Sequence, residues 1–431
     1  MPRIAFIGAG SVEFTKNLLG DILSFPELAE CEIALHDIDD ERLAVAEQMA
    51  RYTARALGAD PTIEVCPDRR RALAGADHAI NMIQVGGHPA TLLDFRIPAA
   101  HGLRQTIGDT LGIGGIFRAL RTIPVMLEIG ADMAELCPDA WLLNYTNPMA
   151  MLCWATYAGS PQRRIVGLCH SVQNTTAELA ALAGVPFAEV SFLGAGVNHQ
   201  AFILRFERAG EDLYPLLDRA IERDPELRRR VRVEIYRRFG YFPTESSEHS
   251  AEYLPWFMRS DEAIERFRVP VDEYIARSEE NLELYEDMRR SLEAGEEIEI
   301  ERSQEYASLI IHSVLTGRER VIYGNVRNDA LIPNLPRGAC VEVPCLVDRN
   351  GVQPTVVGDL PPQLAALNRT FLNVCELTVR GALEGRRDHV HQAALLDPAA
   401  AAALSPDVIH TIVEQLIDAH GDALPEGIRR S

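Results

Sequence analysis

The first forty residues constrain the fold most strongly, because they join two buried strands through a glycine turn and a helix. Residues 4–10 are an apolar strand that runs into a turn, residues 12–25 are helical, and residues 31–39 form a second strand that ends in acidic side chains. The same rhythm continues with strands predicted over residues 62–66, 78–85 and 140–146. Alternation of strands and helices in this order predicts a doubly wound parallel sheet.

The length and the later texture of the chain indicate a second domain. A chain of 431 residues exceeds the usual size of one domain. We expect an α/β protein with a Rossmann-like domain over residues 1–168 and a mixed α/β (α+β) substrate domain over residues 169–431, as in lactate and malate dehydrogenases. Residues 113–136 predict a helix pair or one long helix broken at Pro124, and residues 272–295 predict a long charged helix.

Composition narrows the classes of partner and the compartment. A net charge of −21 repels nucleic acid and anionic membranes, so neither is expected to bind. The longest uncharged stretch, residues 140–162, contains Asn144, Asn147 and Pro148, which favours strand, loop and helix over a membrane span. Eight scattered cysteines without a Cys-x-x-Cys pair are typical of reduced thiols in a cytoplasm.

The glycine turn has the properties of a dinucleotide-binding loop. Gly8 permits a tight turn after the strand, Gly10 permits close approach of a pyrophosphate, and Ser11 begins the helix whose N-terminus would face it. Asp37 ends the second strand, where an acid binds the ribose 2′-hydroxyl and favours NAD over NADP. The third glycine of the usual fingerprint is replaced by Glu13. The alternative is a structural turn whose acidic residues cap the next helix.

A second candidate site is formed by a cysteine and a histidine. Cys169 stands thirty residues before His199, and the pair offers one soft and one nitrogen ligand to a metal ion. Substrate oxygens or water would have to complete such a site, as happens in catalytic metal centres. The alternatives are a buried cysteine that fills the core and a hydrogen-bonded Asn198-His199 pair.

Several long motifs resemble glycoside hydrolase family 4, the NAD- and manganese-dependent glycosidases. The resemblance runs through residues 3–420, and its CHSV, ESSEH and YLPWF segments look closest to the melibiase-type α-galactosidases. One departure is Ile113, where the family's GPGG motif has proline. The motifs that carry the resemblance are residues 8–11, 108–124, 144–150, 167–173, 194–199, 245–257, 305–308 and 325–344.

The resemblance implies a role for each of several residues. Cys169 and His199 fall on the metal ligands, and Asn147 falls on a substrate-binding asparagine. His170 falls on the proton donor. The catalytic base and the acid that assists it fall on Tyr253 and Asp109. Without the resemblance, each of these residues has a structural reading, such as an aromatic packed on a turn or a helix cap. Two further substrate contacts are considered, Arg302 and, with less support, His249.

The implied chemistry departs from the usual pair of carboxylates, because this family is an exception to it. NAD⁺ accepts a hydride from C3 of the sugar, and the resulting ketone makes the C2 proton acidic. A divalent metal stabilises the negative charge that follows. A tyrosine removes the C2 proton and needs assistance, since a free tyrosine has a pKa near 10. Elimination and water addition follow, and the hydride returns.

Other functions remain open at this point. Within the family, an α-galacturonidase or an α-glucosidase is the alternative, and Arg302 offers a cationic partner for a uronate. A 2-hydroxy-acid dehydrogenase would share the fold but would leave Cys169 without a role. An NAD sensor without catalysis would not need Cys169, His199 and Tyr253 together. We expect a small α-glycoside substrate and a homodimer or homotetramer.

Overall fold

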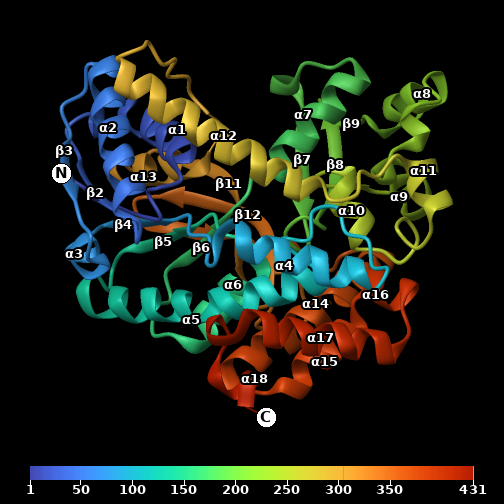
Figure 1. The fold of residues 1–431 in the computed structure, drawn as a ribbon. Helices are drawn as coiled ribbons and strands as arrows, with labels where there is room; N and C mark the ends of the chain where they lie inside the picture. The colour runs from blue at the N-terminus through green and yellow to red at the C-terminus, as the bar shows by residue number, and fades with distance from the viewer. Residues whose placement is uncertain (304, 431) are drawn as a thin grey trace.

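The central feature of the computed structural model, which describes residues 1–303 and 305–430, is a sheet of nine strands (Figure 1). Its order is β13-β12-β11-β6-β5-β4-β1-β2-β3. The strands on this path are β1 (Arg3–Ile7), β2 (Glu32–His36), β3 (Thr62–Val65), β4 (His78–Asn81), β5 (Trp141–Asn144), β6 (Ile165–Leu168), β11 (Arg320–Arg327), β12 (Cys340–Asp348) and β13 (Gly351–Pro354).

The six N-terminal strands pair in parallel and confirm the predicted doubly wound sheet. The register places Ile4 opposite Ile33 of β2 and His78 of β4, so β1 lies between them. β2 also pairs with β3, and β4 is followed by β5 and β6, all in parallel. The connections reverse direction between β1 and β4, which is where open α/β sheets bind ligands at the carboxyl ends of their strands.

Helices cover both faces of the sheet (Figure 1). One face carries α1 (Val12–Leu23), α2 (Asp40–Leu57), α12 (Glu273–Ala294) and α13 (Tyr306–Thr316). The opposite side carries α3 (Arg69–Leu73), α4 (Gly87–Ala100), α5 (Gly112–Leu136) and α6 (Met149–Gly159). The C-terminal helices pack outside this second group and are α14 (Pro362–Glu384), α15 (Arg387–Leu396), α16 (Pro398–Ala403), α17 (Pro406–His420) and α18 (Glu426–Arg430).

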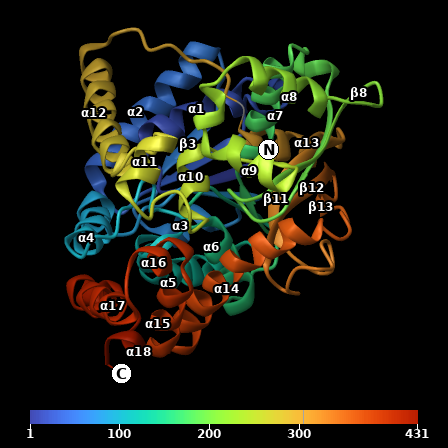
Figure 2. The same ribbon diagram turned by 90° about the vertical axis from the view of Figure 1, so that its right-hand side faces the viewer.

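A smaller sheet lies beside the first one and is visible next to α8 and α9 in Figure 2. Its strands run in the order β10-β8-β7, with β9 paired to β8. They are β7 (Ser191–Ala195), β8 (Phe202–Arg208), β9 (Glu211–Asp212) and β10 (Phe242–Pro243). The helices around them are α7 (Ser171–Ala183), α8 (Tyr214–Arg223), α9 (Val231–Phe239), α10 (Ser247–Glu252) and α11 (Asp261–Phe267). Short 3-10 turns lie at Pro26–Leu28, Phe187–Glu189, Leu227–Arg229 and Gly421–Ala423.

Two elements differ from the simplest sequence expectation. α5 continues through Pro124 as one helix of 25 residues, so the helix pair is not formed. β11 joins β6 in antiparallel fashion and, with β12 and β13, extends the N-terminal sheet. Residues 320–354 therefore belong to the same sheet as the strands before residue 168. The domain boundary expected between residues 168 and 169 stays a prediction. Among helices of the described residues, none is long and apolar enough to cross a membrane.

Candidate active site

The glycine turn after β1 is shaped by two close backbone approaches. Gly8 has a φ of 89°, in the left-handed region that favours glycine, and its N–H donates to the carbonyl of His36 at 2.9 Å. The N–H of Gly10 donates to Asp37 Oδ2 at 2.7 Å. A Cβ atom on Gly10 would lie 2.6 Å from that oxygen and 2.7 Å from Cβ of Arg42. The turn therefore has no room for a side chain at Gly10.

The acidic residues that follow β2 have separate tasks. Asp37 holds the glycine turn, whereas Asp39 caps α2 by accepting hydrogen bonds from the N–H groups of Glu41 and Arg42 at 3.0 Å. Ser11 is exposed at the start of α1, and its side chain makes no capping hydrogen bond. The N-terminus of α1 is thus available to an anion, as a dinucleotide-binding turn requires.

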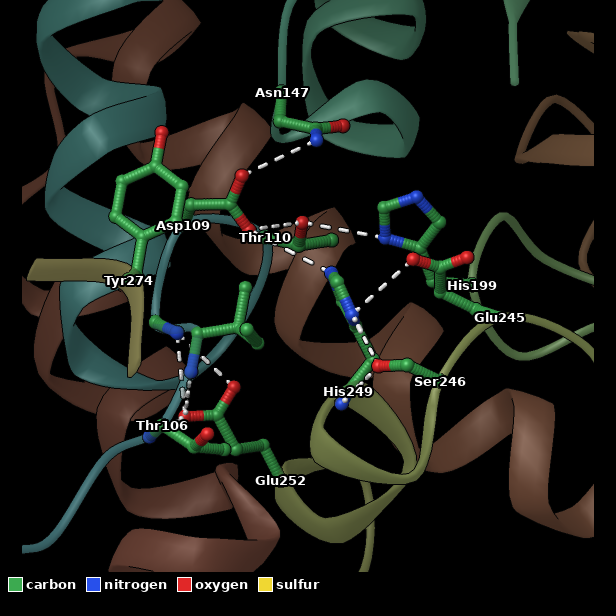
Figure 3. Close-up of polar contacts among 12 residues, drawn as sticks. Thr106, Asp109, Thr110, Asn147, His199, Glu245, Ser246, His249, Glu252 and Tyr274 are labelled. Carbon is green, nitrogen blue, oxygen red and sulfur yellow. Dashed lines mark hydrogen bonds and ion pairs between the residues drawn. The ribbon is translucent and has the colours of Figure 1, made fainter. Parts of the chain in front are cut away.

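A hydrogen-bonded chain connects three predicted site residues at the carboxyl ends of the strands (Figure 3). Asp109 lies before α5 and accepts hydrogen bonds from Thr110 Oγ1 at 2.7 Å and from Asn147 Nδ2 at 3.2 Å. Thr110 Oγ1 also lies 3.4 Å from Nδ1 of His199, which follows β7. Asp109, Asn147 and His199 therefore meet, although they come from three separate loops.

His199 also belongs to a group with metal-binding geometry. Potential ligand atoms of His199, Glu245 and His249 all lie within 4.8 Å of one another. The rings of His199 and His249 make an edge-to-face contact with centroids 4.4 Å apart. Burial lowers the pKa of His249 to about 3, so its ring is neutral and able to bind a metal. Sequence reasoning missed Glu245 and considered His249 only as a substrate contact, although both lie in the motif over residues 245–257.

Cys169 and His170 follow β6, and their side chains have different surroundings. Nδ1 of His170 lies 3.3 Å from Oε1 of Glu305, and this hydrogen-bonded carboxylate raises the pKa of His170 to about 9. The imidazole is therefore protonated at neutral pH, as a proton donor must be. Burial, together with the charges of Glu342 and Glu245, raises the pKa of the Cys169 thiol to about 12. A metal cation would be needed to hold Cys169 as a thiolate.

Glu342 of β12 is an unpaired acid in this region. It is fully buried, and neither side-chain oxygen has a hydrogen-bond partner among the described residues. Burial raises the pKa of Glu342 to about 7, against the charge of His199, which lowers it. An unsatisfied buried acid of this kind is costly without a cation or ligand nearby. Sequence reasoning missed Glu342, although it lies in the motif over residues 325–344, because its neighbours in β12 are apolar.

The two tyrosines near the cluster, Tyr253 and the half-buried Tyr274, are held differently. Tyr253 donates its hydroxyl hydrogen bond to the carbonyl of Asn198 at 3.2 Å and packs edge-to-face on Phe371. Burial raises its pKa well above the usual value. Tyr274 in α12 instead accepts a hydrogen bond from the guanidinium of Arg118 at 2.7 Å. Figure 3 shows the Tyr274 ring beside Asp109. Burial raises the pKa of Tyr274 too, but the Arg118 guanidinium opposes that shift by favouring the phenolate form, so Tyr274 is a second candidate base that sequence reasoning missed.

Glu252 fixes the loop that carries Asp109. Its carboxylate accepts hydrogen bonds from the backbone N–H groups of Thr106 at 2.7 Å, Ile107 at 3.2 Å and Gly108 at 3.0 Å. All of these groups are buried. Helix α10, which lies in the motif over residues 245–257, thus positions the loop that carries Asp109.

Arg302 contacts other residues than those of this cluster. Its guanidinium carbon sits 4.7 Å from the centroid of the Phe25 ring. Together with Asp21, Glu305 and Arg320 it lines a hollow next to α13. Because Glu305 is the partner of His170, Arg302 borders the site from the side of His170.

Comparisons with known proteins show the family to which this chain belongs. A model described as family 4 glycosyl hydrolase matches residues 3–185, and the model of the family's C-terminal domain matches residues 194–400. The α-galactosidase of Bacillus subtilis (strain 168) is 45% identical over 99% of this chain and 100% of its own length. The α-galactosidase of Rhizobium meliloti (strain 1021) is 36% identical, covering 98% of this chain and 89% of its own.

A solved structure shows the same fold at lower identity. The 6-phospho-α-glucosidase from gut microorganisms, solved in complex with NAD and Mn²⁺, superposes with a TM-score of 0.81 at 20% identity, covering 98% of this chain and 99% of its own. The family models and the relatives confirm the resemblance indicated by the sequence motifs.

Proposed function

Since the chain belongs to family 4 of the glycosyl hydrolases, we propose that it hydrolyses terminal α-galactosides with NAD and a divalent metal, Mn²⁺ being the first choice. The main support is that Asp109, Asn147 and His199 lie together and are linked by hydrogen bonds. The protein also shares 45% of its residues with an α-galactosidase. The proposed substrate is therefore a galactoside. An α-glucoside or an α-galacturonide is the alternative.

The proposed NAD site is the turn of Gly8, Gly10 and Ser11, with Asp37 as the partner of the ribose. Support comes from the free N-terminus of α1 and from the missing side chain at Gly10, which leaves the backbone open to a pyrophosphate. When bound, NAD supplies reversible hydride transfer at a sugar carbon. The chain's own task is to hold the dinucleotide above the carboxyl end of β1.

The proposed metal ligands are Cys169 and His199, and the donor chemistry fits a divalent ion. The Cys169 thiol lies close enough to Glu342 and Glu245 for their negative charges to raise its pKa, so a bound cation would offset those charges. When bound, the metal supplies a positive charge beside sugar oxygens. Asn147 is proposed to bind a sugar hydroxyl through its side-chain oxygen, because its amide nitrogen is held by Asp109.

Proton transfers are assigned to side chains of this chain. His170, protonated through Glu305, is proposed to donate a proton to the leaving group. Tyr253 is proposed as the base at C2, with Asp109 assisting. Tyr274 is the alternative base, because its hydroxyl is held by Arg118 instead of by a backbone carbonyl. Loss of a general base typically costs 10²- to 10⁴-fold in rate.

The base is tested by exchange at C2 rather than by turnover alone. The product sugar is incubated in deuterated water with NAD and Mn²⁺, and C2 is followed by NMR for the unmodified enzyme, Tyr253→Phe and Tyr274→Phe. Tyr253→Phe should abolish exchange while NAD binding survives. Loss of exchange in Tyr274→Phe alone would move the base to Tyr274, and equal exchange in all three would remove both.

The substrate is tested with three nitrophenyl glycosides, the α-galactoside, the α-galacturonide and the α-glucoside, each with NAD, Mn²⁺ and a reductant. We expect the α-galactoside to react fastest. If the α-galacturonide reacts fastest, Arg302 is the proposed partner of the sugar carboxylate, and Arg302→Gln should remove the preference. Accumulation of NADH in step with turnover would contradict a glycosidase and indicate a dehydrogenase, because a glycosidase of this type returns its hydride.

We also propose a cytoplasmic homodimer or homotetramer that binds neither nucleic acid nor membranes. Eight free cysteines support the compartment, and the charge of −21 supports the absence of nucleic acid and membrane partners. Light scattering coupled to size exclusion measures the oligomer directly, and a monomer at micromolar concentration would contradict this assignment.

A further inference from the structure

Two loops that carry unusual backbone conformations meet in the metal-binding group described above. His199 lies between β7 and β8 and has a φ of 61°, and Glu245 lies between β10 and α10 and has a φ of 68°. Left-handed backbone at a residue other than glycine costs about 1–3 kcal/mol, and it persists where the surroundings impose it, often at functional sites. In both loops the strained residue is the one whose side chain joins the group.

Neighbouring side chains orient the ligand atoms of this group. Nδ1 of His249 lies 3.1 Å from Ser246 Oγ and 3.4 Å from Glu245 Oε1. Its other ring nitrogen lies 3.9 Å from Asp109 Oδ1. Nδ1 of His199 contacts Thr110, which is bound to the same carboxylate. Partners of this kind fix the ring orientation of histidines that bind metals. Figure 3 shows the Glu245 carboxylate beside the two rings.

The chemistry of manganese favours more than a cysteine and a histidine. Mn²⁺ is a hard ion that prefers carboxylate oxygen and reaches six-coordinate geometry, whereas thiolate ligands suit softer ions. Two histidines and one carboxylate on one side of a metal leave open positions for substrate, and this set recurs in metalloenzymes. Glu245 is mostly buried and has no cationic side chain other than histidine within ion-pair distance in the described residues.

We propose that Glu245 and His249 bind the divalent metal together with His199, so that the ion rests on a face of two histidines and one carboxylate. The inference rests on the proposed function and deepens its metal site. Cys169 then approaches from the end of β6 as a further ligand, and the remaining positions are open to sugar oxygens. Ser246 contacts Nδ1 of His249, and Asp109 lies on the side of its Nε2.

The decisive measurement is Mn²⁺ affinity, followed by the loss of the free-ion electron paramagnetic resonance signal during titration of the whole protein. Glu245→Gln and His249→Gln should each raise the dissociation constant at least ~10-fold, the lower bound seen even for residues that only support ligands. Glu248→Gln is the matched control, because Glu248 lies in the same helix as His249, carries the same charge as Glu245 and is outside the group. It should bind Mn²⁺ as the unmodified protein does.

The outcomes separate the inference from the function it rests on. Equal affinity in all four proteins would overturn the role of Glu245 and His249 and leave Cys169 and His199 as the proposed ligands. Absence of Mn²⁺ binding to the unmodified protein would overturn both. Tight binding through the group, without hydrolysis of any α-glycoside, would overturn the function alone.

A measurement on the unmodified protein covers the case in which a variant fails to fold. Electron spin echo modulation of bound Mn²⁺ detects the nitrogen of each coordinated imidazole. Two imidazoles are expected, from His199 and His249. Coupling to a single imidazole would overturn the inference.

Discussion

Removing the carboxylate of Glu252 should destabilise the protein by an amount that its hydrogen bonds determine. In Glu252→Ala, the buried N–H groups of Thr106, Ile107 and Gly108 lose their acceptor. Each unsatisfied buried donor costs about 1–3 kcal/mol, so three cost roughly 3–6 kcal/mol once water partly fills the space. This is a large part of the 5–15 kcal/mol that typically separates the folded and unfolded states.

The assay is urea unfolding of the protein without NAD or metal, followed by circular dichroism. Glu248→Ala controls for the loss of a charge and side chain from the same helix, and it should change the free energy of unfolding by less than ~1 kcal/mol. Glu252→Gln keeps one acceptor oxygen and should fall between the two. Because Asp109 follows the loop directly, Glu252→Ala should also weaken Mn²⁺ binding. If Glu252→Ala unfolds like Glu248→Ala, the loop does not depend on this carboxylate.

Three further perturbations address the turn, the thiol and the pH dependence. Gly10→Ala should weaken NAD binding at least ~10-fold in a calorimetric titration, because its Cβ would lie 2.6 Å from Asp37 Oδ2; unchanged affinity would contradict a dinucleotide turn. Cys169→Ser should lower Mn²⁺ affinity more than stability, since the hydroxyl is a poorer donor than a thiolate; a variant with normal affinity would make Cys169 a structural thiol. Burial lowers the pKa of His78 to about 4, from 6.5 in the unfolded chain, so its contribution to stability is complete above pH 6.5 and is lost as the pH falls towards 4. Over that range the unfolding free energy should fall by up to roughly 3 kcal/mol more than in His78→Leu, and parallel decline in both would contradict the assignment.

Much of the fold follows from local pattern in the sequence. The strand, the turn of Gly8 and Gly10 and the strand that ends at Asp37 are close in sequence, so spacing alone predicts β1, α1 and β2. The hydrogen bond from Gly10 to Asp37 then explains why this acid and this glycine occur together. The motif over residues 245–257 likewise predicted a functional segment, and its residues Glu245 and His249 lie beside His199.

Other features were decided only when distant segments packed together. β11 adds to β6 although nothing in residues 320–327 specifies a partner, because strand pairing depends on which edge the preceding helices leave open. Glu342 stands in an apolar strand, and only burial beside Cys169 makes it unusual. Arg118 and Tyr274 are joined by one hydrogen bond across two helices that share no motif.

The same distinction between local pattern and tertiary packing holds for the candidate site. Residue types and motif spacing predicted a dinucleotide turn and a metal-binding pair of cysteine and histidine, and they carried the family resemblance, since these are properties of neighbouring residues. Tertiary structure decided that His199 faces Glu245 and His249, and that Asp109 faces Asn147. The physical reason is that the chemistry of a side chain can be read from its own position in the sequence. The distance between two loops instead depends on the packing of every sheet and helix between them.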